Sequence, residues 1–125
     1  MSSRSPRPDD SERLRQFKAE FFKALAHPVR IAILEFLRGG PRSVGEIGAL
    51  TGVPGSSISQ QLAVLRGRGI VVPQRAGTTI WYHVADPEIY ALLDAARRIF
   101  YGHLSGSADL LRLVEAEANE VAIPG

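Results

Sequence analysis

The sequence predicts a mainly α-helical protein with one small β-hairpin, in the order ααααββαα. Apolar residues recur at the three- and four-residue spacing of amphipathic helices along most of the chain. Two runs rich in β-branched and aromatic residues, Ile70–Gln74 and Thr79–Val84, are joined around Ala76 and Gly77, which is typical of a hairpin. Beyond the hairpin, Asp86 and Pro87 predict the start of a long helix, as N-cap and first-turn residue.

Length and composition fit one compact domain. With 125 residues the chain can bury a core, and we expect that domain over residues 11–118. Residues 1–10 are polar and interrupted by proline, which predicts a disordered N-terminal tail, and residues 119–125 are expected to be a frayed C-terminal tail.

Several classes of function are disfavoured by what the sequence contains. The chain has no cysteine, which excludes disulfides, thiolate metal sites and a cysteine redox switch. No apolar run approaches the length of a membrane span, and the N-terminus does not resemble a signal peptide, so we expect a cytoplasmic protein without a membrane partner. A phosphate-binding loop, a nucleophile elbow and paired carboxylates beside a histidine are all missing, so we do not expect an enzyme.

The segment from Ser43 to Gly67 predicts two helices joined by a tight turn. Ser43 and Glu46 have the spacing of a capping box, in which each side chain satisfies an amide at the start of a helix. Gly52 ends this helix, because glycine enters the left-handed cap conformation without penalty. The next helix has one apolar stripe, formed by Ile58, Leu62 and Leu65. Followed by a hairpin, this arrangement is a winged helix-turn-helix, which places one helix in the major groove of DNA.

The face opposite the apolar stripe should carry the function. Ser56, Gln60 and Ala63 point away from the stripe, Ser57 and Ser59 flank that outer face, and Gln61 lies nearer its buried edge. Glutamine can pair with the edge of adenine through two hydrogen bonds. An ordinary solvated helix face would have a similar composition, so this pattern alone leaves both interpretations open.

Charge placement favours nucleic acid. Between Arg38 and His83 the chain has five arginines and a single acid, Glu46, whereas the part from Val84 onward is acidic. Clustered arginine neutralises phosphates and makes affinity fall as salt rises. The candidate DNA contacts are therefore polar or basic residues of the second helix, its approach and the hairpin: Ser56, Ser57, Ser59, Gln60, Gln61, Arg42, Arg66, Arg68, Arg75, Thr78 and Thr79.

Two flanking helices carry more apolar surface than a small domain can obviously cover. One lies between Ser11 and Leu25, and the other runs from Pro87 to about Leu104; a short last helix is expected after Gly106. We expect these stripes to form a dimer, although a monomer core could also use them. The candidate interface residues are Leu14, Phe17, Phe21, Ile89, Leu92, Leu93, Ala96 and Phe100.

From Phe22 to Leu93 the chain resembles the ArsR/SmtB family of bacterial winged-helix repressors. The resemblance lies in Lys-Ala-Leu-Ala-His-Pro-x-Arg at 23–30, Ser-Val-x-Glu-Ile at 43–47, and Ser-Ser-Ile-Ser-Gln-Gln-Leu-x-Val-Leu at 56–65. Within the family the chain is most similar to actinobacterial members that lack the usual metal ligands. The resemblance implies a homodimer that binds an operator inverted repeat in double-stranded DNA and represses a nearby promoter.

The resemblance also raises the question of a metal. Gly45 stands where many family members have a cysteine ligand. At the positions of the family's second metal site, the only candidate ligands in this sequence, and weak ones, are Asp86, Glu88 and His103. Asp86 and His103 would be about 25 Å apart along one helix, so they could meet only across a dimer. A lone histidine on this stripe fits an interface residue as well, and we expect no cofactor; if a metal bound, Zn²⁺ or Ni²⁺ would suit these ligands.

One other class of function stays open, a winged-helix module that docks on another protein without specific DNA binding. A salt series separates the two, because arginine contacts to phosphate are steeply salt-dependent and apolar docking is not.

Overall fold

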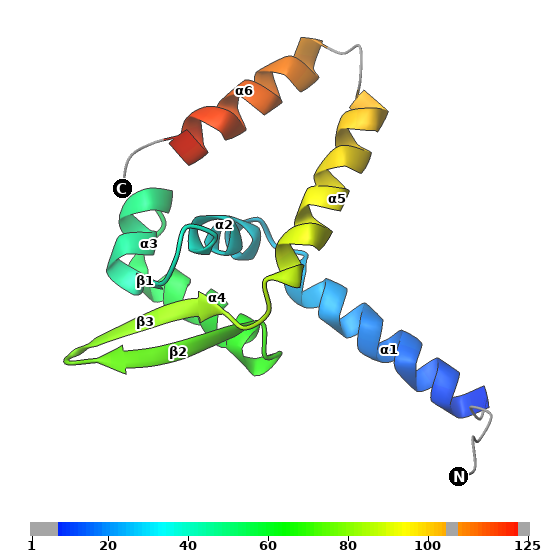
Figure 1. Ribbon diagram of the computed structural model, residues 1–125, viewed down its shortest axis with the longest axis horizontal. Coiled ribbons are helices and arrows are strands. Elements are labelled where there is room, and N and C mark those ends of the chain that lie inside the picture. Colours follow the sequence, from blue (N-terminus) through cyan, green and yellow to red (C-terminus); the bar gives the residue numbers. More distant parts are fainter. Residues whose placement is uncertain (1–7, 105–107, 123–125) are drawn as a thin grey trace.

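The computed structural model describes residues 8–104 and 108–122, and its elements confirm the predicted class (Figure 1). The elements in chain order are α1 (Pro8–Leu25), α2 (Pro28–Leu37), β1 (Arg42–Ser43), α3 (Val44–Thr51), α4 (Gly55–Gly67), β2 (Val71–Ala76), β3 (Thr79–Val84), α5 (Glu88–Leu104) and α6 (Ala108–Ala122). The predicted order lacked β1, which is only two residues long and has no periodicity of its own.

Both ends of the predicted domain differ by a few residues. Helix α1 starts at Pro8, inside the segment expected to be a tail, and α6 continues to Ala122, past the expected boundary at residue 118. The rest of the two predicted tails, residues 1–7 and 123–125, lies outside the described residues.

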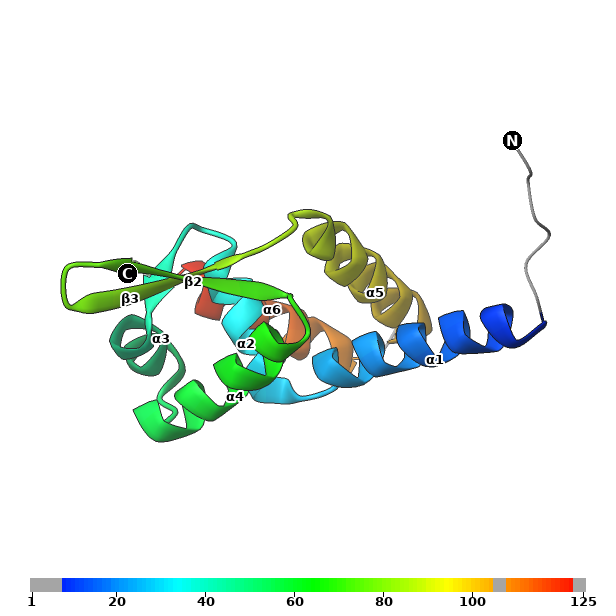
Figure 2. The same ribbon diagram turned by 90° about the horizontal axis from the view of Figure 1, so that it is seen from below.

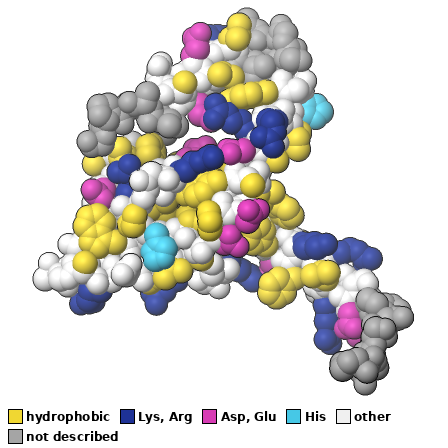
Figure 3. All heavy atoms as spheres, in the orientation of Figure 1, with side chains coloured by type: hydrophobic (Ala, Val, Ile, Leu, Met, Phe, Trp, Pro, Cys, Tyr) yellow, Lys and Arg dark blue, Asp and Glu magenta, His cyan; other side chains and the backbone are white. Residues whose placement is uncertain are grey.

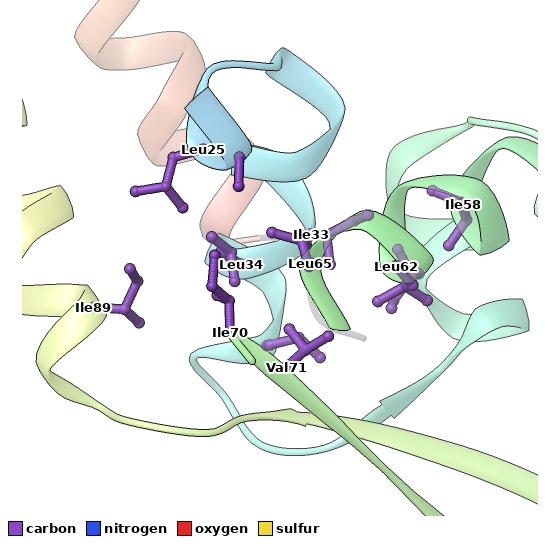
Figure 4. Close-up of a cluster of buried hydrophobic side chains, with 12 residues drawn as sticks. Leu25, Ile33, Leu34, Ile58, Leu62, Leu65, Ile70, Val71 and Ile89 are labelled. Atoms are coloured by element: carbon purple, nitrogen blue, oxygen red, sulfur yellow. The ribbon is translucent and has the colours of Figure 1, made fainter. Parts of the chain in front are cut away.

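The hydrophobic core lies where α2, α3 and α4 meet the base of the hairpin (Figure 4). The stripe of α4 is fully used here, since Ile58, Leu62 and Leu65 are at most 1% exposed. The other buried apolar residues are Ala24, Leu25, Ile33, Leu34, Leu37, Ile47, Ile70, Val71 and Ile89. Helix α2 is thus a central packed helix, which fixes α4 relative to the rest of the molecule.

The three strands form one antiparallel sheet in the order β1-β3-β2. In the hairpin, Val71 pairs with Val84 and Ala76 with Thr79, which leaves a two-residue turn at Gly77 and Thr78. Gly77 has φ 65°, the left-handed conformation that such turns require. Strand β1 joins the outer side of β3 just before α3, so the wing is tied to the first helix of the helix-turn-helix.

The predicted capping signals are confirmed. The Ser43 hydroxyl accepts from the amide of Glu46, and the Glu46 carboxylate accepts from the amide of Ser43, both at 3.2 Å. Gly52 ends α3 with φ 73°. The Asp86 carboxylate accepts from the amide of Glu88 at 3.0 Å and caps α5.

The outer helices extend from this central unit. Figures 1 and 2 show α1 projecting away from the body, with α5 rising beside its C-terminal end and α6 running back from the far end of α5 toward the side that holds α3. Residues 9–20 of α1 are all exposed. Within the described part of the chain, no helix combines the length and the apolar character needed to cross a membrane.

Candidate nucleic-acid interface

Helix α4 presents a polar outer face to solvent. Burial of its apolar stripe leaves Ser56, Ser59, Gln60, Ala63 and Arg66 exposed, with Ser57 half-buried at the edge. The predicted orientation of this helix is therefore confirmed. The face combines hydroxyl, amide and guanidinium groups with a small residue that permits close approach to a neighbouring surface.

Gln61 has a different environment from Gln60. It is half-buried, and its side-chain oxygen accepts a hydrogen bond from Nη1 of Arg30 on α2 at 3.1 Å. The Nε of Arg30 is buried and makes no hydrogen bond within the described structure. Gln61 therefore links the two helices, and sequence periodicity could only place it near the buried edge because its partner lies 31 residues earlier.

The wing lies beside α4 and adds basic and hydroxyl groups. Arg75 and Thr78 are exposed near the turn, and Thr79 is half-buried. A shallow groove between α4 and β3 is lined by Ser59, Arg66 and Tyr82. Figure 3 shows Lys and Arg side chains along the lower edge of the molecule, beneath the hairpin and α4. These two elements together present a basic, hydrogen-bonding surface.

Two arginines that we predicted as DNA contacts are held by the protein itself. Arg68 forms an ion pair with Glu20 and so connects the end of α4 to α1. The Nε of Arg42 donates to the carbonyl oxygen of Phe36 at 2.8 Å, and its side chain lines a cavity between α2 and α5. The partners Arg68 and Glu20 are 48 residues apart, so this pairing leaves no local signal in the sequence.

The apolar stripes of α1 and α5 are divided between the core and the surface. Leu14, Phe17 and Phe100 are 55%, 77% and 61% exposed. Such exposure is required of side chains that would contact a second copy of the chain. Ile89, by contrast, is 6% exposed and belongs to the core of the chain itself, so its assignment to an interface is corrected. The remaining predicted interface residues are half-buried: Phe21, Leu92, Leu93 and Ala96.

Helix α5 is fastened to α2 by contacts that sequence analysis missed. Arg38 donates two hydrogen bonds to Asp94, at 2.7 and 2.8 Å, and stacks over the ring of Tyr90. The Tyr90 hydroxyl donates to the carbonyl oxygen of Leu34 at 2.7 Å. The hydrogen bond from Arg38 lowers the pKa of Asp94, and burial raises the pKa of Tyr90 to about 12.

The weak candidate metal ligands stay apart within one chain. Asp86 and Glu88 lie at the start of α5, while His103 is exposed in its last turn. Among the described residues, no three His, Asp or Glu side chains are grouped to hold a metal ion. Whether the two ends meet across a dimer stays a prediction.

Comparison with known proteins shows which proteins share this sequence pattern. Residues 25–74 match the model of a helix-turn-helix domain family. The chain is 45% identical over 108 residues to an uncharacterised HTH-type transcriptional regulator of Mycobacterium tuberculosis, Rv0081, covering 86% of this chain and 95% of the relative. It is 36% identical to the biofilm growth-associated repressor of Xylella fastidiosa, covering 74% and 81% of the two chains.

Solved structures agree. The crystal structure of Rv0081 superposes with a TM-score of 0.69 at 48% identity, covering 74% of this chain and 93% of the other. The homodimeric winged helix-turn-helix DNA-binding domain of Mb0332 from Mycobacterium bovis, a possible ArsR-family transcriptional regulator, superposes with a TM-score of 0.71 at 30% identity, covering 84% and 94%. With this fold and these relatives, the chain belongs to the ArsR/SmtB family of winged helix-turn-helix transcriptional regulators and is not an enzyme.

Proposed function

We propose that the protein is a repressor that binds an operator inverted repeat as a homodimer. The outer face of α4, with Ser56, Ser57, Ser59 and Gln60, would enter the major groove, and the wing would contact the adjoining backbone through Arg75, Thr78 and Thr79. The observation that supports this best is the exposure of the polar face of α4 beside a basic wing, while its apolar face is buried in the core.

The projecting helix α1 supports the dimer. In proteins, most of the stability of a helix comes from packing of its apolar face against another element. Phe17 is 77% exposed on this helix, and Phe100 and Ile99 are exposed on α5. A second copy would cover these side chains, and the homodimeric state of the M. bovis relative supports dimerisation.

Repression rather than activation is supported by the biofilm growth-associated repressor among the relatives. We place the protein in the cytoplasm, since a regulator of promoters has to share a compartment with the chromosome.

The test is a titration of fluorescent duplexes followed by anisotropy. The specific duplex is a promoter fragment from the protein's own locus that contains an inverted repeat, and the control duplex has the same composition in shuffled order. We expect tighter binding to the repeat and an affinity that falls steeply with salt. Equal, weak binding to both duplexes would contradict operator recognition and favour a protein-docking module.

A further inference from the structure

A cavity of about 680 Å³ lies on the side of α2 that faces away from α4. Ile31 and Glu35 line the cavity, whereas Ile33 and Leu37, on the opposite face of α2, are buried in the core. The volume is in the range of small-molecule sites, about 300–1,000 Å³. The cavity is distinct from the surface that we assign to DNA.

The walls come from four helices of the same chain. The end of α1, α2, α5 and Glu117 of α6 contribute to the lining, and an ion pair between Arg97 and Glu117 at 3.0 Å joins α5 to α6. Most of the lining is apolar and much of it is aromatic, including Phe22, Ile31, Phe36 and Tyr90. Leu93 and Phe100 also line the cavity, and both belong to the proposed dimer interface as well. Flat, apolar walls of this kind favour a ring-containing ligand.

The polar side chains that line the cavity differ in whether they already have partners within the chain. Arg38 is bound by Asp94, and Arg97 is bound by Glu117 and the Tyr101 hydroxyl. In Figure 3 basic and acidic side chains are gathered between α6 and the body of the molecule, above an apolar area.

Arg42 is the exception among the three arginines. Its Nε is held by the carbonyl oxygen of Phe36, and no ion pair within the described residues engages its two terminal amino groups. Glu35 also lines the cavity, but it has an interaction of its own. A guanidinium fixed at Nε and open at both Nη atoms matches a carboxylate, which accepts two parallel hydrogen bonds.

We propose that this cavity binds an aromatic carboxylate as the effector of the regulator, with Arg42 as the anchor of the carboxylate. The inference rests on the proposed function for its regulatory meaning. The cavity lies between α5, which carries part of the proposed dimer interface, and α2, which packs on α4. A ligand that favours one spacing of these helices changes operator affinity to the extent that it binds the two spacings differently.

Calorimetric titration of the full chain without DNA tests the site, with 2-naphthoate as the probe. We expect one site per chain, weaker binding of the neutral analogue 2-naphthamide by about tenfold or more, and no measurable binding of acetate. The variant Arg42→Gln should lose about tenfold or more in affinity for 2-naphthoate and bind 2-naphthamide as the wild type does. Arg75→Gln, the same change at the exposed wing, should bind both compounds normally.

The variant Arg42→Lys keeps the charge but not the fork, and serves if Arg42→Gln does not fold; it should also bind 2-naphthoate more weakly. If the wild type binds its operator but does not bind 2-naphthoate, the proposed site is wrong and the proposed function is unaffected. This is the result expected if a second copy fills the cavity. Equal affinities of wild type and folded Arg42 variants would overturn the anchor. Binding of 2-naphthoate with unchanged operator affinity would overturn the effector role.

Discussion

Gln60 and Gln61 are neighbours in sequence, but we expect Gln60 to contact DNA and Gln61 to stabilise the fold. Gln60 is exposed on the outer face of α4, so Gln60→Ala should cost about 1–3 kcal/mol on the operator and less on shuffled DNA. Gln61→Ala should instead lower the free energy of unfolding by about 1–3 kcal/mol, because the half-buried Arg30 loses its acceptor. Anisotropy and urea unfolding distinguish the two. If Gln60→Ala lost equal affinity on both duplexes, Gln60 would have no part in base recognition.

Tyr90 makes stability depend on pH in the alkaline range. Its pKa is raised to about 12 from an ordinary value of 10, mainly by burial. The unfolded chain therefore releases this proton first, and the free energy of unfolding should fall as pH rises from about 10 to 12. Tyr90→Phe should remove that dependence and cost about 1 kcal/mol at neutral pH through the lost hydrogen bond to Leu34. Urea unfolding at several pH values checks this, and an unchanged alkaline dependence in Tyr90→Phe would assign it to other groups.

Residue identity alone did not reveal which arginines are available to contact DNA. Arg42, Arg66, Arg68 and Arg75 are equivalent candidates in the sequence, yet the fold leaves Arg66 and Arg75 exposed and turns Arg42 toward Phe36 and Arg68 toward Glu20. These pairings depend on how α1 packs beside the end of α4 and on how the chain turns after α2, which hydropathy and spacing do not encode.

At the scale of elements, the contact between the wing and DNA can be tested through the salt dependence of DNA affinity. Arg75→Ala removes an exposed charge near the hairpin turn, so binding should weaken on all sequences. The slope of log affinity against log salt should become shallower by about one unit. Arg98→Ala, an exposed arginine on α5, is the control and should leave the slope unchanged. An unchanged slope for Arg75→Ala would mean that the wing arginine faces away from DNA.

Helix α1 gives the cleanest probe of the interface. Phe17 is 77% exposed in the single chain, so Phe17→Glu should leave the core intact while placing a charge in the proposed apolar seam. Sedimentation should show a folded monomer. Ala96, the other candidate for such a charge, is half-buried and lines the cavity, so Ala96→Glu would disturb the chain itself. A fully dimeric Phe17→Glu protein would exclude α1 from the interface.

Most elements were predictable because their signals are local. The stripe of α4, the capping box at Ser43 and the positive φ of Gly52 and Gly77 all arise within a few residues. Strand β1 was missed because it exists only through pairing with β3, in which Arg42 lies opposite Tyr82, 40 residues later in the chain. The position of α6 was equally beyond local patterns, since its ion pair with α5 involves Arg97 and Glu117.

For the whole molecule, two-fold symmetry determines what DNA can be recognised. Two copies joined through α1 and α5 would present two α4 helices to one side of a duplex, with half-sites about 34–36 Å apart.

The stoichiometry and spacing of the operator complex test this account most directly. Sedimentation of the chain with duplexes that carry one half-site, the intact inverted repeat, or the repeat with five inserted base pairs measures both. The account predicts two chains on the intact repeat, and much weaker binding to the single half-site and to the inserted duplex, where the half-sites face opposite sides. One chain bound to a single half-site at the affinity of the intact repeat would contradict it.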